Sequence, residues 1–332
     1  MAQLYDQYGR TVKRQELKAP KATVSVTGVR APWSGTMASG LTPERLARIL
    51  LDCDQGSLTD YAILAEEMEE RDPHYASVLG TRKRAVSGVA AMVRPASEDK
   101  ADEDLAQMVR DGLTEDPRFP DLVEDLLDAI GKGFSVVELR WGSDANAWWI
   151  DGWEQVEARF LTLDRETGRE LRLIDEADPL NGVALTPFQH VVHRPRLKSG
   201  AVQRGGLARL VAFSWMCKSY TIKDWMNFVE IYGLPLRLGR YGAGATQADI
   251  EALFLAVSNI GTDAAAVLPE SARIEFQQVT GSQSEAVFEN LARYLDEQIS
   301  KAVLGQTMTS DDGASLAQAA VHNEVRHDIA RA

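Results

Sequence analysis

The spacing of apolar residues along this 332-residue chain changes at Gly131 and Gly133. Before that point, apolar side chains recur every three or four residues, as they do in helices that bury one face. Glycines in this position are typical of a helix C-terminus. After them, apolar and polar residues alternate, which is the period of a strand with one buried face. The change of period indicates an α+β fold in which a helix-rich part is followed by an antiparallel β meander.

Capping residues, two of them followed by proline, mark the first three helices. Thr42, Ser57 and Asp72 are expected to start them. The helices before Gly133 are expected over 42–53, 57–71, 72–89, 102–115 and 119–133. The segment "AAMVRPAS" (90–97) is expected to be a strand that ends at Pro95. Residues 1–40 have no sustained period, so they are expected to form an extended basic arm that only a partner orders.

The alternating segments after Gly133 are expected to form one continuous meander, with turns where glycine and aspartate gather. Its strands are expected over 134–142, 147–157, 159–164, 170–174 and, last, 188–196, with turns at 142–144, 164–168 and 178–182.

A long central helix over 207–232 is apolar on more than one face, so it is expected to be covered on several sides. Shorter elements follow it. They are a strand over 234–241, a helix over 246–260, strands over 264–270 and 272–279, and a helix that Ser282 or Ser284 caps and Gly305 ends. A last helix, over 315–332, is still in full period where the sequence stops.

Charge is distributed unevenly along the chain, whose net charge is −13. Residues 194–242 carry nine Lys/Arg and two acidic residues, a net charge of +7, so the remainder carries −20. The acidic total argues against a general coat for nucleic acid, and the asymmetry points to a specific partner for the basic segment. The sequence has no apolar run of the roughly 20 residues that a membrane span requires.

The stretch "LPLRLGRYGAGATQADIEALF" has the strand–glycine loop–helix order of nucleotide-binding loops. Gly239 and Gly244 have the spacing of a Walker loop, but the lysine that neutralises phosphate is missing after Gly244. The neighbouring strands are expected to be antiparallel, which disfavours a dinucleotide fold. Thr246 is better explained as a helix cap with Asp249 in the capping-box position, although anion binding stays open.

No other set of residues makes a convincing catalytic or metal site. His190 and His193 are three apart on a strand and face opposite ways, and Cys53 and Cys217 are expected to be buried free thiols. The acidic runs at 64–72 and 121–128 are expected to be solvated helix faces. Four tryptophans are expected to pack in a core or an interface: Trp141, Trp148, Trp149 and Trp153. The sequence therefore predicts no enzyme, no cofactor and no metal.

Five segments, taken in order, resemble the portal proteins of Mu-like phages and prophages. They are "EEMEERDPHYASVLGTRKRAV", "AIGKGFSVVELRW", "KDWMNFVEIYGLPLRLGRYG", "AAAVLPESARIEF" and "ISKAVLGQTMTSDDGASLAQAAVHNEVRHDIARA". The resemblance covers essentially the whole chain. It implies a non-enzymatic ring, normally of twelve copies, at one vertex of the capsid in the virion, assembled in the host cytoplasm. The implied partners are the terminase large subunit, capsid and scaffold proteins, head–tail adaptors and double-stranded DNA that passes through the channel, with no membrane.

The resemblance also implies wing, stem, clip and crown regions. Residues 41–200 are expected to form the wing, 201–305 its core with the long helix and an α/β segment, and 306–332 the start of a helix toward the stem. Because the last helix is still in period at the end of the sequence, stem, clip and crown are expected to be mostly missing.

The basic segment supplies the candidate site residues: Arg194, Arg196, Lys198, Arg204, Arg237 and Arg240. We favour contact with a neighbouring subunit through the acidic helices at 64–72 and 121–128, because opposite charges fix register in a ring. Contact of the first four cations with DNA stays open. The alternative functions are a phage nucleotide-binding or nuclease enzyme that uses the Gly239–Thr246 loop, and a monomeric capsid-associated adaptor.

Overall fold

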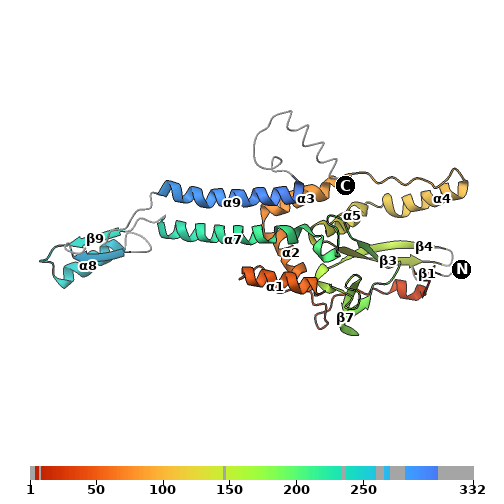
Figure 1. Cartoon of the computed structure of the whole chain (residues 1–332), viewed down its shortest axis with the longest axis horizontal. Helices are drawn as coiled ribbons and strands as arrows, with labels where there is room; N and C mark the ends of the chain where they lie inside the picture. The colour runs from red at the N-terminus through yellow and green to blue at the C-terminus, as the bar shows by residue number, and fades with distance from the viewer. Residues whose placement is uncertain are drawn as a thin grey trace, which may run out of the picture. The chain divides into compact units, whose positions relative to one another are not determined.

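The computed structural model describes residues 4–6, 9–144, 147–232, 237–258, 265–269 and 281–305 (Figure 1). The chain divides into two compact units. Unit 1 consists of residues 1–216 and 296–332, and unit 2 consists of residues 217–295. Both units combine helices with strands, so the expected α+β class is confirmed.

The helices of unit 1 follow the predicted capping signals closely. They are α1 (Pro43–Asp54), α2 (Thr59–Arg71), α3 (Pro73–Ser87), α4 (Lys100–Val109), which continues as a π-helical turn over Arg110–Thr114, α5 (Phe119–Leu127) and α6 (Ala129–Lys132). The Thr42 hydroxyl accepts the Arg45 N–H at 3.2 Å, and the Asp72 carboxylate accepts two N–H groups at the start of α3. The predicted Ser57 cap is wrong, because α2 begins two residues later without a side-chain cap.

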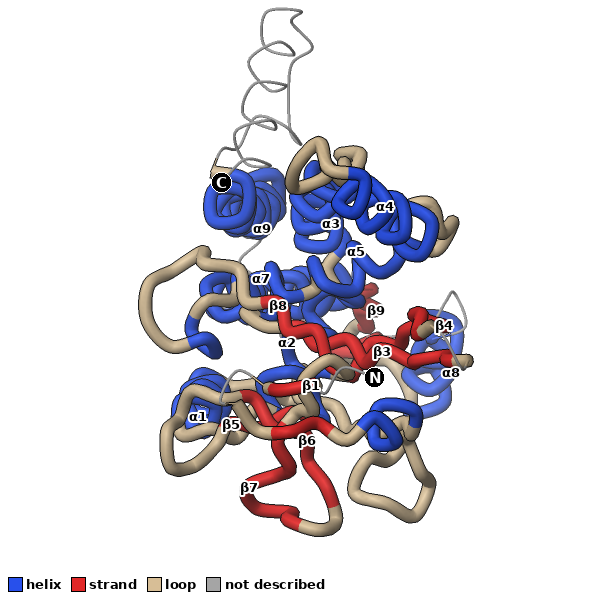
Figure 2. The backbone as a smooth tube through the Cα atoms, turned by 90° about the vertical axis from the view of Figure 1, so that its right-hand side faces the viewer, coloured by secondary structure: helices blue, strands red, loops and turns tan. Residues whose placement is uncertain are grey.

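Two separate antiparallel sheets replace the single meander that the alternation predicted (Figure 2, red). In one sheet β3 (Ser135–Ser143) lies between β4 (Trp148–Val156) and β8 (His190–His193). The other sheet has the order β5 (Leu161–Leu163), β6 (Leu171–Asp175) and β7 (Asp178–Ala184). The strand β8 pairs with the free edge of β3, which makes β3 the central strand. Val136 and Val137 of β3 point to opposite faces and are both fully buried, so both faces of this sheet are covered. Part of the expected turn at 178–182 is the start of β7.

The strand expected over 90–97 does not form. This segment has no strand beside it, its Met92 side chain is 72% exposed, and the Val93 carbonyl accepts hydrogen bonds from the Arg110 guanidinium instead. A short β-prone sequence without a pairing partner leaves its backbone groups to side chains or water.

A close backbone approach joins the helices of unit 1 to α7 (Leu207–Tyr232), the long central helix that the sequence predicted. A Cβ atom on Gly206 would lie 2.4 Å from the carbonyl carbon of Lys132, so only glycine fits there. Gly133 faces the same segment with φ of +98°, and it ends α6 as expected. The first turns of α7 are buried at Leu207, Val211 and Trp215.

Unit 2 contains a parallel βαβ arrangement. Its strands are β9 (Arg237–Tyr241) and β10 (Ala265–Pro269), which pair in parallel and are connected through α8 (Gln247–Ser258). The expectation of antiparallel neighbours is therefore wrong for this part of the chain. The rest of unit 2 is the second part of α7 and the first part of α9 (Gly281–Leu304), where the rings of Phe228 and Phe288 are 5.6 Å apart.

The helix α9 ends at Gly305 with φ of +72°, as expected, but it begins at Gly281, before Ser284. The strand expected over 272–279 and the helix expected over 315–332 lie outside the described residues. Among the described helices, none combines the length and the apolar character needed to cross a membrane.

Candidate functional site

Residues 19–38, which we call the strap, are tied to unit 1 at both ends by buried carboxylates. At one end, the N–H groups of Lys21 and Ala22 donate to the Glu138 carboxylate on β3 at 2.6 and 3.0 Å. At the other end, the N–H groups of Met37 and Ala38 donate to the Glu67 carboxylate on α2 at 2.6 and 2.7 Å. Each carboxylate thus accepts two consecutive N–H groups, so the strap is recognised through its backbone.

Both carboxylates depend on these donors because they are removed from water. Glu138 is 5% exposed and Glu67 is 7% exposed. Burial alone would raise the pKa of Glu67, but hydrogen bonds from Thr36, Ala38 and Met37, with the Arg71 charge, hold that pKa below its ordinary value. Loss of the strap would leave two buried charges with few partners, which is costly.

Side chains fasten the middle of the strap as well. The Arg30 guanidinium donates to the Ile174 carbonyl and pairs with Asp175, and Arg159 donates to the carbonyls of Pro32 and Trp33. Just before the strap, Leu17 on the 3-10 helix Arg14–Lys18 is 2% exposed. The expectation that only a partner orders this arm is therefore wrong for its described residues. The sequence signal that could have revealed the attachment is Glu138 itself, an acid within the apolar run of β3.

The two acidic runs predicted from the sequence line one open trough of about 560 Å³ in unit 1. The first run lies on α2 and the second on α5 and the residue after it. Six carboxylates line this acidic trough: Glu66, Glu69, Asp121, Glu124, Asp125 and Asp128. Three cations also line it, namely Lys83, Arg84 and Lys132, so acids outnumber bases.

Two lysines lie beneath the trough and are almost fully buried. Lys132 is 5% exposed and forms ion pairs with Glu66 and, at 2.6 Å, with Asp128. Burial alone would lower the pKa of Lys132, but the charges of Asp128 and Glu66 outweigh it and raise that pKa. Lys83 pairs with Glu69 at 2.8 Å and with Asp128 at 3.4 Å. The acidic runs are therefore partly a buried ion-pair network, and not only solvated faces.

The lysines do not neutralise the whole trough. Burial, together with the charges of Asp121, Asp128 and Glu124, raises the pKa of Asp125. A carboxylate with a raised pKa gains from any cation that approaches it, so the trough favours a positively charged partner.

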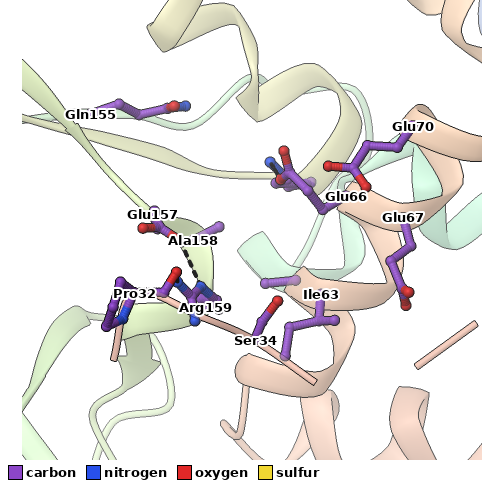
Figure 3. A pocket seen from close by; sticks show the side chains of 12 residues that line it. Pro32, Ser34, Ile63, Glu66, Glu67, Glu70, Gln155, Glu157, Ala158 and Arg159 are labelled. Carbon is purple, nitrogen blue, oxygen red and sulfur yellow. Dashed lines mark hydrogen bonds and ion pairs between the residues drawn. The ribbon is translucent and has the colours of Figure 1, made fainter. Parts of the chain in front are cut away.

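A second cavity, of about 310 Å³, lies between the strap and α2 (Figure 3). Figure 3 shows Glu66 and Glu70 of α2 on one side, and Pro32 of the strap with Arg159 on the other. Glu66, Lys132 and Gln155 line both this cavity and the trough, so the two hollows are adjacent.

The predicted basic site residues separate into different environments. Arg194, Arg196 and Lys198 are exposed between β8 and the 3-10 helix Val202–Arg204, and they form no ion pair within the described part of the chain; we call residues 194–201 the basic loop. Arg204, in contrast, is paired inside the chain, because the Asp54 carboxylate accepts bonds from both Arg204 and Arg209 at 2.6 and 2.9 Å.

Burial alone would raise the pKa of Asp54, but the Arg204 and Arg209 guanidinium groups outweigh it and lower that pKa. Arg240 is exposed on β9 of unit 2, and Arg237 begins the same strand. The structure thus brings the two acidic runs together, leaves Arg194, Arg196 and Lys198 exposed in one loop, and pairs Arg204 with Asp54.

The glycine loop leads into α8 in the βαβ order of nucleotide-binding proteins, and its cap is the predicted capping box. The Thr246 hydroxyl donates to the Asp249 carboxylate at 2.7 Å, and the Thr246 N–H donates to it at 3.0 Å. These hydrogen bonds from Thr246 lower the pKa of Asp249, so a negative charge already occupies this helix N-terminus and opposes phosphate.

The histidines and cysteines have separate structural partners. Nδ1 of His193 contacts the Leu126 carbonyl, whereas Nδ1 of His190 accepts the Thr186 N–H, so the two do not act together. Cys53 is a buried free thiol whose pKa burial raises to about 12, and Cys217 is a free thiol that is only partly buried. No group of three or more possible metal ligands occurs among the residues that the structure describes.

The four tryptophans contact their own chain, in line with the predicted packing role. The Trp149 ring lies against Gly142, where a Cβ would be 2.4 Å from Nε1. The Trp141 N–H donates to the Phe188 carbonyl at 2.7 Å, and its ring lies edge-on to Trp148. The cations of Arg14 and Lys18 lie over Trp148, and that of Arg118 lies over Trp153.

Comparison with known proteins identifies the family to which the chain is similar. A family model described as "Portal protein of Mu bacteriophage" matches residues 62–332. The chain is 36% identical over 312 residues to "Mu-like prophage FluMu protein gp29" of Haemophilus influenzae and 34% identical over 298 residues to the portal protein of Escherichia phage Mu. These matches cover 90% and 89% of this chain but 58% of each relative, so the chain spans little more than half the length of these curated relatives.

A solved structure, an HK97 family phage portal protein from Corynebacterium diphtheriae, aligns with a TM-score of 0.42 and 11% identity, covering 87% of this chain and 84% of that chain. The family model extends over most of the chain, including both acidic runs, the basic loop and the whole of unit 2. The chain therefore belongs to the family of the Mu bacteriophage portal protein.

Proposed function

We propose that this chain is the ring-forming part of a phage portal, at the capsid vertex through which DNA enters and leaves the head. Membership of the portal family supports the proposal. One structural observation supports it most directly: the same unit carries an acidic trough with an excess of carboxylates and a basic loop whose cations lack partners among the described residues. A chain with two complementary surfaces can bind a copy of itself repeatedly.

The proposed contact places the basic loop of one copy in the acidic trough of the next. Such a head-to-tail contact uses two different patches, and it closes into a ring when the rotation between copies is right. Arg194, Arg196 and Lys198 supply three cations, and Glu124 and Asp125 are among the trough acids that receive them. Charged contacts of this kind select register and direction more than they raise affinity.

The family also suggests the number of copies in the ring and the proteins that the ring contacts. We propose a ring of about twelve copies, as is usual for the family, that contacts the terminase large subunit, capsid and scaffold proteins and head–tail adaptors. Double-stranded DNA passes through it, and the net charge of −13 suits a channel that DNA must not adhere to. Assembly in the host cytoplasm belongs to the same proposal.

The proposed role requires no catalysis. The rival enzyme would use the glycine loop, but Asp249 holds the cap position with a negative charge and the Walker lysine is missing. Where wing, stem and clip begin stays a prediction. The chain divides within α7, after Met216, so unit 2 (217–295) lies within the segment 201–305 that we propose as the core of the wing.

Charge reversal tests the proposal. Native mass spectrometry and electron microscopy of the full chain should show closed rings. Arg194→Glu combined with Arg196→Glu should weaken assembly, and Glu124→Lys with Asp125→Lys in the same chain should partly restore it. Lys223→Glu on α7 of unit 2 is the matched control and should assemble normally.

A chain that stays monomeric at high concentration would favour the adaptor alternative. Rings that form normally despite the reversals, while filled heads retain less DNA, would show instead that the basic loop contacts DNA. Reversal of Arg237 and Arg240 in unit 2 tests whether the second part of the basic segment contributes as well.

A further inference from the structure

The strap exposes several apolar side chains. Four of its large side chains are exposed within ten residues: Val24, Val26, Val29 and Trp33. Trp33 and Val26 are each 64% exposed. Isolated apolar residues on a surface are ordinary, but a cluster that includes tryptophan marks a contact surface.

The strap is also held in place by side chains of unit 1, which distinguishes it from a mobile arm. Carboxylates hold both of its ends, and Arg159 bonds the carbonyl of Trp33 itself at 3.1 Å. A segment that is already ordered loses little conformational freedom when a partner binds it, so its exposed side chains form a preorganised surface.

The strap borders the acidic surface. Pro32 and Ser34, the neighbours of Trp33, line the cavity that lies next to the trough and shares Glu66 and Lys132 with it. An apolar patch with Trp33 therefore lies beside a charged one. This arrangement, an aromatic centre with a polar surround, is typical of protein interfaces.

The basic loop is preceded by a matching sequence of features. Phe188 and Val191 are 45% and 36% exposed, and they precede Arg194, the first just before β8 and the second within it. Phe188 is also the one non-glycine residue with positive φ, +64°, in the described part of the chain. Backbone strain of this kind persists where the surrounding structure holds it and is concentrated at functional positions. The side of the chain that offers cations thus also offers apolar side chains.

We propose that a second copy of this chain covers the strap, with Trp33 as the central apolar anchor. The inference rests on the proposed ring and adds the contact that supplies its affinity. In this contact the strap of one copy receives the Phe188–Val191 surface of the next, while the following basic loop enters the trough. One surface offers exposed apolar side chains close in sequence to cations, and the other offers exposed apolar side chains beside carboxylates, which favours a second copy over an unrelated partner.

Hydroxyl-radical footprinting read by mass spectrometry tests the proposal, because it reports the solvent exposure of individual tryptophans. Trp33 should be oxidised readily in the dissociated chain and strongly protected in the ring. Trp149 on β4, which is 44% exposed, is the internal reference and should be oxidised equally in both states. Trp33 that reacts equally in ring and monomer overturns the proposal, and so does Trp33 that is already protected in the monomer.

A variant pair gives an independent measurement. Trp33→Ala should weaken ring association about tenfold or more, as truncation of a central anchor does, whereas Trp149→Ala should change it little. The circular dichroism and melting temperature of the dissociated variants check that both fold. Rings that form normally with Trp33→Ala refute the strap contact and leave the proposed ring intact, whereas absence of rings in the unmodified chain refutes the ring itself.

Discussion

Unit 1 and unit 2 differ in how completely each one buries its own apolar side chains. Unit 1 buries residues from nearly all its elements, including Tyr61, Leu79, Phe134 and Leu163. In unit 2, among the side chains that the structure describes, Leu295 is the one buried apolar residue, while nine large ones are exposed. The exposed ones are Tyr220, Ile222, Met226, Val229, Phe254, Leu255, Val287, Leu291 and Tyr294.

This difference indicates that the two units obtain their stability from different sources. Unit 1 has an apolar core of its own, and a buried ion-pair network lies beside that core. Among the residues that the structure describes, unit 2 leaves large apolar side chains of its helices exposed. The expectation that α7 is covered on several sides is therefore met by its first turns, which are buried in unit 1, and not by its second part. Exposed large apolar side chains in this number point to burial by partners.

The largest expected effect is in the buried network of unit 1. Lys132→Ala leaves the Asp128 carboxylate with a weaker partner and should cost about 3–5 kcal/mol of unfolding free energy, measured by chemical denaturation. Lys223→Ala in unit 2, an exposed lysine, is the control and should stay within about 0.5 kcal/mol. Equal effects of the two substitutions would remove the contrast between the units.

Two leucines one turn apart on α9 sharpen the contrast within unit 2. Leu295 is 7% exposed and Leu291 is 45% exposed. In the dissociated chain, Leu295→Ala should cost about 2–5 kcal/mol, whereas Leu291→Ala should cost less than about 1 kcal/mol. Sedimentation at several concentrations should show that Leu291→Ala mainly weakens association. A large loss of monomer stability with Leu291→Ala would mean that unit 2 completes its own core.

The backbone contact at the start of α7 offers a matched pair of glycines. Gly206→Ala would place a Cβ 2.4 Å from backbone atoms and should cost about 1–3 kcal/mol or prevent folding, as overpacking does. The nearest atom to a Cβ on Gly205 lies at 3.3 Å, so Gly205→Ala should be much milder. The melting temperatures of the two variants, measured by thermal unfolding, compare these effects. Equal melting temperatures would show that α7 can move away from α6.

The smallest effect concerns the strap, and it depends on pH. The pKa of Glu67 lies below its ordinary value of 4.5, so its contribution to strap attachment is fully present above that pH and is lost as pH falls through the lowered pKa. Exchange of the Met37 and Ala38 amides, corrected for intrinsic rates, should therefore accelerate in acid. Glu67→Gln should reproduce the acceleration at neutral pH at a cost of about 0.5–1.5 kcal/mol, whereas Glu70→Gln should not. Unchanged protection in Glu67→Gln would show that Arg159 and Thr36 suffice.

Local signals in the sequence predicted local structure well. Thr42 and Asp72 cap α1 and α3, Gly133 and Gly305 end α6 and α9, and Thr246 with Asp249 forms the predicted capping box. These features depend on contacts between residues that are close in the chain.

The errors concern contacts between distant residues. The alternation that marks a strand does not state its partner, so β8 returning to β3 and β10 pairing in parallel with β9 could not be derived from it. The acidic runs were recognised, but their meeting in one trough depends on how α2 and α5 pack. The strap was missed because its attachment uses backbone N–H groups, which carry no sequence signal of their own.

That mode of attachment has an evolutionary consequence. Because the carboxylates of Glu67 and Glu138 bind N–H groups, the residues at positions 22, 37 and 38 can change to almost anything except proline without loss of these bonds. The outward side chains of the strap are therefore free to diverge while its anchorage stays constant. A lineage of such chains could alter which copies assemble together by substitutions on the strap alone, with the folded body beneath it left unchanged.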